Sequence, residues 1–352
     1  DVKGPIGPAT RDYVTRSLET ASEAGASLVV IRLDTPGGLD ASSRDIVKAI
    51  LGSPVPVAPF VTPEGARAAS AGTYILYGSH IAAMSPATYV GAATPVSMMG
   101  DTPRPEPMRK PGPPTDEEPT DEEQGSKPTA GESGNAMAQK VVNDAVAWIR
   151  GLAEKRGRNA DWAELAVRDA ASISSEEALD LGVIDLIARD VADLLKQLDG
   201  ITVQVADREL VLHTSGMVID QLEPDWRNEF LAVITSPTIA YLLLLIGIYG
   251  LILEGYNPGA IVPGVVGAIC LLMALYALQM LPVNYAGLGL IALGVILMIA
   301  EVMAPSFGAL GIGGIIAMVI GSVILIDTDV PGFAVSRALI GSIAAAGSLG
   351  LM

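Results

Sequence analysis

Ser70 stands in a run of small residues that is typical of an accessible nucleophile. The run reads Arg67-Ala68-Ala69-Ser70-Ala71-Gly72-Thr73-Tyr74 and precedes an apolar stretch. A serine at the start of a helix lies at the positive end of the helix dipole, where a developing alkoxide is stabilised. Small residues at a helix start also serve close packing. These residues alone leave both interpretations open.

A second candidate part of an active site is the turn Asp34-Thr35-Pro36-Gly37-Gly38. It follows an apolar run, so it stands at the carboxyl end of a predicted strand. A Gly-Gly turn at this place can direct backbone N–H groups into a crevice, as an oxyanion hole requires. The alternative is an ordinary strand-to-helix turn.

A general base is harder to find. The two histidines, His80 and His213, are isolated, and His80 opens a predicted strand, where a structural role is more usual. Lys140 is a candidate, but a lysine with an ordinary pKa near 10.4 acts as a base only if burial lowers that value. It could equally be a solvated helix residue. The sequence contains no zinc pattern, P-loop or GxGxxG motif, so we expect neither a cofactor nor a metal.

Strand and helix signals alternate through the part of the chain that carries these residues. Apolar runs spaced in this way predict βαβ units and a largely parallel sheet, the α/β class. Ser174-Ser175-Glu176-Glu177 has the form of a capping box that starts a helix. The predicted strands cover 28–33, 55–61 and 81–84, the predicted helices 39–51, 135–156, 175–181 and 190–198, and a terminal hairpin 201–212.

Residues 98–134 differ in kind from the rest. The stretch Asp101–Gly134 holds 8 of the 24 prolines and 9 acidic residues, with hardly an apolar side chain. Such a composition cannot bury enough surface to offset the entropy of ordering. We expect a disordered insertion, either a plain solvated loop or a flexible arm.

Charge and hydropathy divide the chain in two. The net charge is −17, yet half of the residues are hydrophobic and mean hydropathy is +0.44. The first 230 residues carry 21 basic and 35 acidic groups, and no Lys or Arg occurs from 228 to 336. This division excludes a plain cytosolic enzyme. It also argues against nucleic-acid binding, which needs a basic face.

The uncharged part predicts a membrane domain. Spanning an apolar core takes roughly 20 residues. Trp226, Arg227 and Phe230 suit a helix at the membrane interface, just before the first span. With no basic residue to count, charge does not predict the orientation. The predicted spans are 237–253, 260–281, 286–303 and 307–326, with a fifth that begins near Ala334.

The membrane part contains a repeat. Glu254, Pro258, Gly264 and Gly267 recur as Glu301, Pro305, Gly311 and Gly314, each 47 residues on. The pattern predicts two similar helical hairpins in which glycines let helices approach closely. The two glutamates either form an ion path or stand at helix ends, and their position favours helix ends. The first and last residues suggest a removed N-terminal segment, a secretory signal being the leading candidate, and an incomplete C-terminus.

Taken together, these motifs closely resemble the NfeD family of membrane-bound Clp-type serine proteases, also called stomatin operon partner proteins. The resemblance covers nearly the whole chain. Parts of it are shared with signal peptide peptidase A and related crotonase-like folds. It is carried by the segments DTPGG (34–38), RAASAGTYI (67–75), GSHIAAM (78–84), Lys140, GRNADWAE (157–164), SSEEALDLGVID (174–185) and LEGYNPGAIVPGVVGAI (253–269).

This resemblance implies a Ser-Lys dyad with Ser70 as nucleophile and Lys140 as general base. Gly38 and Ala71 would donate the oxyanion-hole amides. It also implies a Clp/crotonase-like protease domain over residues 1–222 and an all-α transmembrane domain of about five helices over residues 223–352.

The family resemblance further implies where the protein acts and on what. We expect an integral protein of a bacterial or archaeal cell membrane, in contact with lipid, with an extracytoplasmic protease domain that forms homo-oligomers. A hydrophobic peptide would be the substrate and a stomatin (SPFH)-type membrane protein the partner. One alternative is a non-catalytic scaffold that binds such a partner. A transporter built on the repeat is disfavoured by the scarcity of polar residues within the spans.

Overall fold

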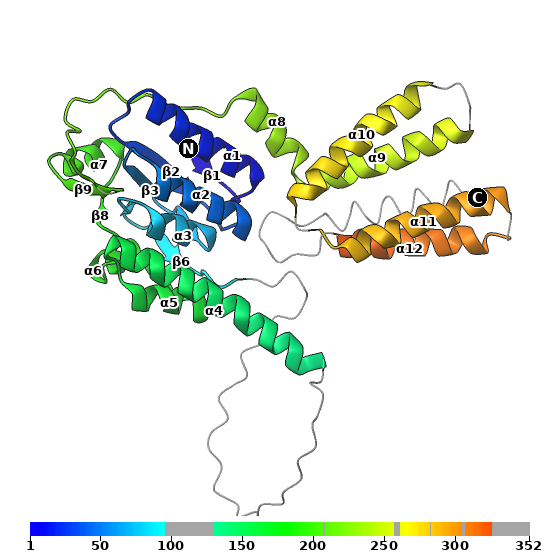
Figure 1. Ribbon diagram of the computed structural model, residues 1–352, viewed down its shortest axis with the longest axis horizontal. Helices are drawn as coiled ribbons and strands as arrows, with labels where there is room; N and C mark the ends of the chain where they lie inside the picture. The colour runs from blue at the N-terminus through cyan, green and yellow to red at the C-terminus, as the bar shows by residue number, and fades with distance from the viewer. Residues whose placement is uncertain (96–129, 207, 257–260, 282, 305–306, 326–352) are drawn as a thin grey trace, which may run out of the picture.

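The N-terminal part of the chain folds around a parallel sheet (Figure 1). The computed structural model describes residues 1–95, 130–206, 208–256, 261–281, 283–304 and 307–325. Five strands pair in the order β1-β2-β3-β5-β8, and every pairing is parallel. The predicted α/β class is therefore confirmed. The strands are β1 (Val2–Lys3), β2 (Val29–Asp34), β3 (Val57–Val61), β5 (Ala83–Met84) and β8 (Leu186–Ile187).

Strand β3 shows how the two faces of this sheet are covered. Val57 and Val61 join one apolar cluster, whereas Ala58 and Phe60 join another, because successive side chains of a strand point to opposite faces. The first cluster includes residues of six helices, and the second includes residues of a helix and a hairpin. The six helices are α1 (Pro8–Glu23), α2 (Asp40–Gly52), α3 (Ala71–Gly78), α4 (Ala130–Arg156), α5 (Ala160–Arg168) and α6 (Ser175–Asp180). The helix of the second cluster is α7 (Val191–Leu198), and its hairpin is β9 (Thr202–Val205) and β10 (Arg208–Val211).

A second, smaller sheet was not predicted. It consists of β4 (Arg67–Ala69), β6 (Tyr89–Gly91) and β7 (Ser172–Ser174) in the order β4-β6-β7. A single bridge from Thr35 to Ala68 links β4 to the end of β2. These strands are only three residues long and pair with partners far away in the chain. No local periodicity therefore marks them.

Two local predictions have different outcomes. Helix α6 (Ser175–Asp180) begins with the predicted capping box: the Ser174 hydroxyl accepts from the Glu177 N–H, and the Glu177 carboxylate accepts from the Ser174 N–H. The predicted insertion 98–134 was drawn too long, because 130–134 form the first turn of α4. Residues 96–129, the bulk of that prediction, lie outside the described residues.

The C-terminal part consists of apolar helices arranged as two hairpins (Figure 1). Two of the helices, α9 and α10, are long and apolar enough to cross a membrane, and α11 and α12 contain shorter apolar segments. The predicted fifth span begins outside the described residues. The four helices are α9 (Pro237–Tyr256), α10 (Ile261–Met280), α11 (Tyr285–Met303) and α12 (Ala309–Leu325).

The predicted repeat has a structural meaning. A Cβ atom added at Gly247 would stand 2.8 Å from the backbone of Leu271, and one at Gly294 would stand 2.6 Å from the Gly314 carbonyl oxygen. Both glycines therefore let the two helices of a hairpin touch, and they too are 47 residues apart. Close backbone approach through small residues is a common basis of helix packing in membranes.

Glu301 stands at a helix end. Its carboxylate accepts hydrogen bonds from the N–H groups of Gly308, Leu310 and Gly311, at 2.9, 3.0 and 3.2 Å. These donors surround the start of α12, where the first N–H groups lack intrahelical acceptors and the helix dipole favours an anion. Glu254 lies directly against Gly264 in the first hairpin. Both glutamates therefore face the start of the second helix of their own hairpin.

Candidate active site

Ser70 occupies the sharp turn between β4 and α3. Its backbone has φ 50° and ψ −112°, a region that residues with a side chain rarely adopt. The turn is held from both sides, because the Ser70 N–H donates to the Gly91 carbonyl at 2.9 Å and the Ser70 carbonyl accepts from the Thr73 N–H. A strained serine on a strand-to-helix turn is the arrangement of a nucleophile elbow.

The two glycine-containing motifs meet at this turn. A Cβ atom added at Gly37 would stand 2.7 Å from the Ser70 Cβ, and one at Gly72 would stand 2.7 Å from the Thr35 methyl carbon. The Thr35 hydroxyl in turn donates to the Gly37 carbonyl at 3.1 Å. The small residues are thus required because the Asp34–Gly38 turn lies against the serine turn.

Among the hydrogen bonds of the described residues, none uses the N–H of Gly38 or of Ala71, which both lie beside Ser70. In the bridge between Ile6 and Gly38, the bonds run from the Ile6 N–H to the Gly37 carbonyl and from the Leu39 N–H to the Ile6 carbonyl, both at 2.8 Å. Neither uses the N–H of Gly38, which points away from Ile6. Ala71 is the first residue of α3, where N–H groups have no intrahelical acceptor. The geometry brings three predicted residues, Ser70, Gly38 and Ala71, to one place.

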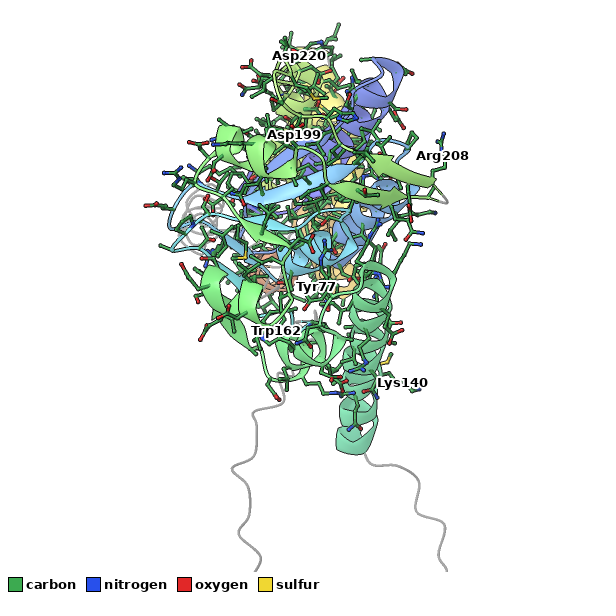
Figure 2. All side chains as sticks on the ribbon, turned by 90° about the vertical axis from the view of Figure 1, so that its left-hand side faces the viewer. Tyr77, Lys140, Trp162, Asp199, Arg208 and Asp220 are labelled. Atoms are coloured by element: carbon green, nitrogen blue, oxygen red, sulfur yellow. The ribbon has the colours of Figure 1, made fainter. Side chains whose placement is uncertain are left out.

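Lys140 is placed differently. Figure 2 shows it on the portion of α4 that extends away from the sheet, and its side chain is exposed. Within the described ranges no hydrogen bond links it to Ser70. Trp148, eight residues further on and therefore about 12 Å along the helix axis, anchors α4 on α3. No contact among the described residues links Lys140 to the serine turn, so its catalytic role stays a prediction.

The anchor itself is a residue that sequence reasoning did not connect with the site. The Trp148 ring stacks on Tyr74 of α3, with centroids 4.4 Å apart, and the Arg44 guanidinium lies 4.3 Å from its centroid on the other side. Arg44 also pairs with Asp40 at 2.8 Å and with Asp144 at 2.6 Å. Burial raises the pKa of the Tyr74 hydroxyl well above its usual range. This stack connects α4 to both α2 and α3.

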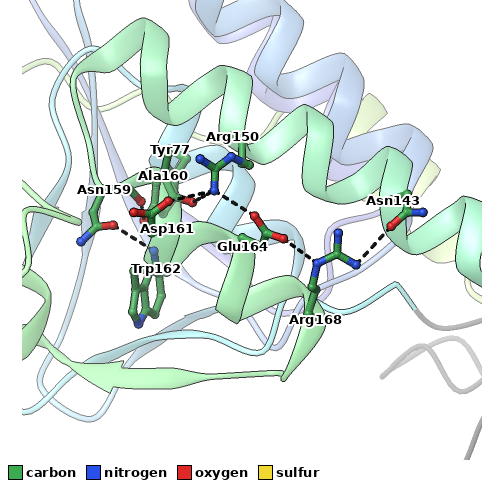
Figure 3. Close-up of polar contacts among 9 residues, drawn as sticks. All are labelled: Tyr77, Asn143, Arg150, Asn159, Ala160, Asp161, Trp162, Glu164 and Arg168. Carbon is green, nitrogen blue, oxygen red and sulfur yellow. Dashed lines mark hydrogen bonds and ion pairs between the residues drawn. The ribbon is translucent and has the colours of Figure 1, made fainter.

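A row of ion pairs fixes α4 against α5 (Figure 3). Arg150 of α4 pairs with Asp161 at 3.0 Å and Glu164 at 2.8 Å, and Glu164 also binds Arg168 at 2.6 Å. Arg168 donates back to Asn143 of α4 at 3.1 Å. The contacts span both ends of α5, so they limit rotation of the part of α4 that follows Asn143.

Arg158 is a second residue that the sequence did not single out, and it supports the helix that begins at Ser70. Its side chain is only 2% exposed, and one guanidinium nitrogen donates to the carbonyls of Leu76, Tyr77 and Ser79 at 2.9 to 3.0 Å. The other pairs with Asp185 at 2.6 Å. A cation at these carbonyls caps the C-terminus of α3, the helix that begins at Ser70. The only sequence signal was an arginine inside the GRNADWAE motif.

His80 lies buried beneath this end of α3 and is not placed to serve Ser70. Its ring Nδ1 accepts from the Val57 N–H at 3.2 Å, and the backbone N–H of His80 donates to the Val57 carbonyl at 3.1 Å. Burial, followed by the nearby Arg156 and Arg158, lowers the pKa of the ring to about 4. The expectation of a structural histidine is therefore supported.

His80 should make stability depend on pH. The unfolded chain takes up a proton near pH 6.5, whereas the folded ring stays neutral down to about pH 4. Stability is therefore greatest above pH 6.5 and falls as the pH drops from 6.5 to 4. The full shift corresponds to roughly 3 kcal/mol, which solvent screening reduces to on the order of 2 kcal/mol. His80→Asn keeps an acceptor for Val57 and should remove this part of the pH dependence. Urea unfolding at pH 4.5 and 7.5 measures the free energy of unfolding of both proteins. If this free energy fell by the same amount between pH 7.5 and 4.5 in wild type and variant, the prediction would be contradicted.

Among the residues that the structure describes, no three or more His, Cys, Asp and Glu side chains gather in a way that could hold a metal ion. The chemistry that the serine turn can perform rests on a hydroxyl and two backbone N–H groups.

Known proteins resemble both parts of the chain. A family model described as the NfeD integral membrane domain matches residues 238–352, and one described as the NfeD1b N-terminal domain matches residues 2–105. The membrane-bound protease PH1510 of Pyrococcus horikoshii is 35% identical over 328 residues, which are 92% of this chain and 67% of that protein. The membrane protein NfeD1b of Bacillus subtilis is 27% identical over 323 residues, 87% of this chain and 62% of that protein. The chain thus spans about two thirds of each relative.

Solved structures resemble the N-terminal part. A lysine-to-alanine mutant of the 1510-N membrane-bound stomatin-specific protease, in complex with a substrate peptide, has a TM-score of 0.53 at 33% identity. The match covers 66% of this chain and 94% of that one. A serine-to-alanine mutant of the same protease has a TM-score of 0.51 at 34% identity, covering 64% and 95%. The predicted fold of the N-terminal part is confirmed by these matches.

Proposed function

The chain belongs to the NfeD family of membrane proteins, and on this premise we propose that it is a membrane-anchored serine endopeptidase. It is an integral membrane protein by its matched membrane domain and apolar helices. Its 35% identity to a membrane-bound protease supports protease function in the membrane. The observation that carries the proposal is the strained Ser70 turn with the Gly38 and Ala71 N–H groups beside it.

In the proposed reaction Ser70 is the nucleophile. Its Oγ loses a proton to neutral Lys140 and attacks the carbonyl carbon of a peptide bond, and the oxyanion is held by the N–H groups of Gly38 and Ala71. Collapse of the intermediate breaks the C–N bond, and the leaving amine takes the proton from Lys140. Water then hydrolyses the acyl-enzyme. The exposed Lys140 has to approach Ser70 and lose solvent before it can act as this base.

The relatives support a proposal for the substrate and the partner. The solved relatives are named as specific for stomatin, and one holds a substrate peptide. We propose a hydrophobic peptide segment of a stomatin-type membrane protein as the substrate, and a homo-oligomer with an extracytoplasmic protease domain as the acting form. Residues 1–222 would form the protease domain and residues 223–352 the membrane domain.

Covalent labelling tests the proposal. The full chain in lipid vesicles is treated with a fluorophosphonate, which reacts with activated serines, and the labelled peptide is identified by mass spectrometry. We expect one label on Ser70, and less label when a hydrophobic peptide competes. Lys140→Ala should slow labelling strongly, whereas Lys196→Ala, at another exposed lysine on α7, should not. Labelling spread over several serines would contradict the proposal.

A non-catalytic scaffold is the second candidate, and the exposed position of Lys140 favours it. In that case the same fold holds a stomatin-type partner without cleaving it. The two functions differ in one assay. If the partner co-purifies with wild type and Ser70→Ala alike, remains intact and Ser70 is not labelled, the scaffold is correct.

A further inference from the structure

Helix α8 (Trp226–Ile234) has two faces of different character. Asn228, Leu231 and Ile234 are buried, whereas Trp226 is 78%, Phe230 49% and Val233 55% exposed. At 100° per residue, the three exposed residues form a single stripe on the side away from the buried ones. An exposed apolar stripe of this kind, with a tryptophan, marks a surface that contacts another protein or a membrane.

The buried face of α8 is docked on the protease domain. The Arg16 guanidinium pairs with Asp225 at 3.0 Å, and Asn228 donates to the Asp12 carboxylate at 3.0 Å. The Tyr13 hydroxyl donates to the Leu222 carbonyl at 2.6 Å. Three polar contacts thus attach α8 and the segment before it to α1. Because α1 covers the buried face of α8, the exposed stripe lies on the opposite face and is not covered by α1.

The stripe continues the surface of the membrane helices. Only Thr235 and Ser236 separate α8 from α9, and Figure 1 shows α8 running across the direction of the hairpin helices. Tyr285, at the start of α11, is 80% exposed, and Arg227 precedes a long stretch without any basic residue. Trp and Tyr gather at the membrane–water boundary, and a helix of this pattern lies in that plane.

We propose that the Trp226–Phe230–Val233 stripe rests in the headgroup region of a lipid bilayer and holds the protease domain against the membrane surface. One further contact fits this placement: Leu39, the residue after Gly38, is buried in the apolar cluster of the membrane helices, together with Leu281. The serine turn therefore stands near the membrane. The consequence for the substrate, that it is a segment leaving the bilayer, rests on the proposed function.

Tryptophan quenching tests the contact without any assay of activity. The full chain is placed in phosphatidylcholine vesicles whose acyl chains carry bromine near the carbonyl end. Trp226 is one of three tryptophans, so bromine should remove up to about a third of the emission. Trp226→Phe should abolish this quenching, because Trp162 is buried and Trp148 stacks on Tyr74. Bromine deeper in the chains should quench less.

Two variants and one control complete the experiment. Phe230→Ser/Val233→Ser should weaken the quenching of Trp226, whereas Leu165→Ser, at an exposed leucine of α5, should leave it unchanged. Equal quenching in wild type and Trp226→Phe would overturn the proposal. Shielding of Trp226 from acrylamide without quenching by bromine would also overturn it, since a protein or a second copy would then cover the stripe. A failure of Ser70 labelling leaves these results unaffected.

Discussion

Replacing Ser70 with alanine should lower peptide cleavage by on the order of 10³-fold or more, because the reaction loses its nucleophile. Alanine retains a Cβ, so it meets the same backbone strain at φ 50° as serine does. The Ser70 side chain does not cap α3, so the change removes no such bond from the helix start. Thermal stability should therefore stay within about 0.5 kcal/mol of wild type. Cleavage of a hydrophobic peptide by the full chain in lipid vesicles, followed by mass spectrometry, measures the loss.

Two further substitutions separate catalysis from strain. Ser70→Gly should be as inactive as Ser70→Ala but more stable by about 1 kcal/mol, because glycine adopts a positive φ without cost. Ser27→Ala changes an exposed serine at the start of the segment leading into β2 and should keep full activity. If Ser70→Ala retained cleavage within tenfold of wild type, Ser70 would not be the nucleophile.

Replacing Arg158 with methionine should destabilise the protease domain by about 3 kcal/mol. The change removes a donor from the carbonyls of Leu76, Tyr77 and Ser79 and the cation from Asp185, and the Leu76 carbonyl keeps only the hydroxyl and N–H of Ser79 as donors. We choose the lower part of the range for a broken buried pair because the Asp185 side chain is 40% exposed and can take up water. For a domain of this size, the loss corresponds to a lower melting temperature by roughly 6–12 °C.

Thermal unfolding of the full chain in detergent, followed by tryptophan emission, measures this loss. Trp162 stacks on Tyr77 of α3, so its emission reports on the same helix. Arg189→Met removes the ion pair of an 82% exposed arginine with Asp193 and should change stability by less than about 0.5 kcal/mol. A similar loss in both variants would show that the buried contacts of Arg158 carry no special weight.

Much of the architecture could be predicted from the sequence because it depends on interactions between residues close together in the chain. The apolar run before Asp34, the capping box at Ser174 and the helices of the membrane domain each follow from a local pattern. The 47-residue repeat and the division between a charged and an uncharged part are also properties of the sequence alone. Periodicity and composition indicate whether a segment faces water, the protein core or lipid, and the fold class follows from this information.

The candidate site depended on contacts between segments far apart in the chain. Small residues around Ser70 indicated a helix start but not its positive φ, and the Ser70 N–H is held by Gly91, on a strand of the unpredicted sheet. Arg158 meets the end of α3 from about 80 residues away. Trp148, on the same helix as Lys140, meets Tyr74 from 74 residues away in the chain. Such contacts leave no periodic trace in the sequence, because each joins single residues whose meeting depends on the packed arrangement of the whole domain.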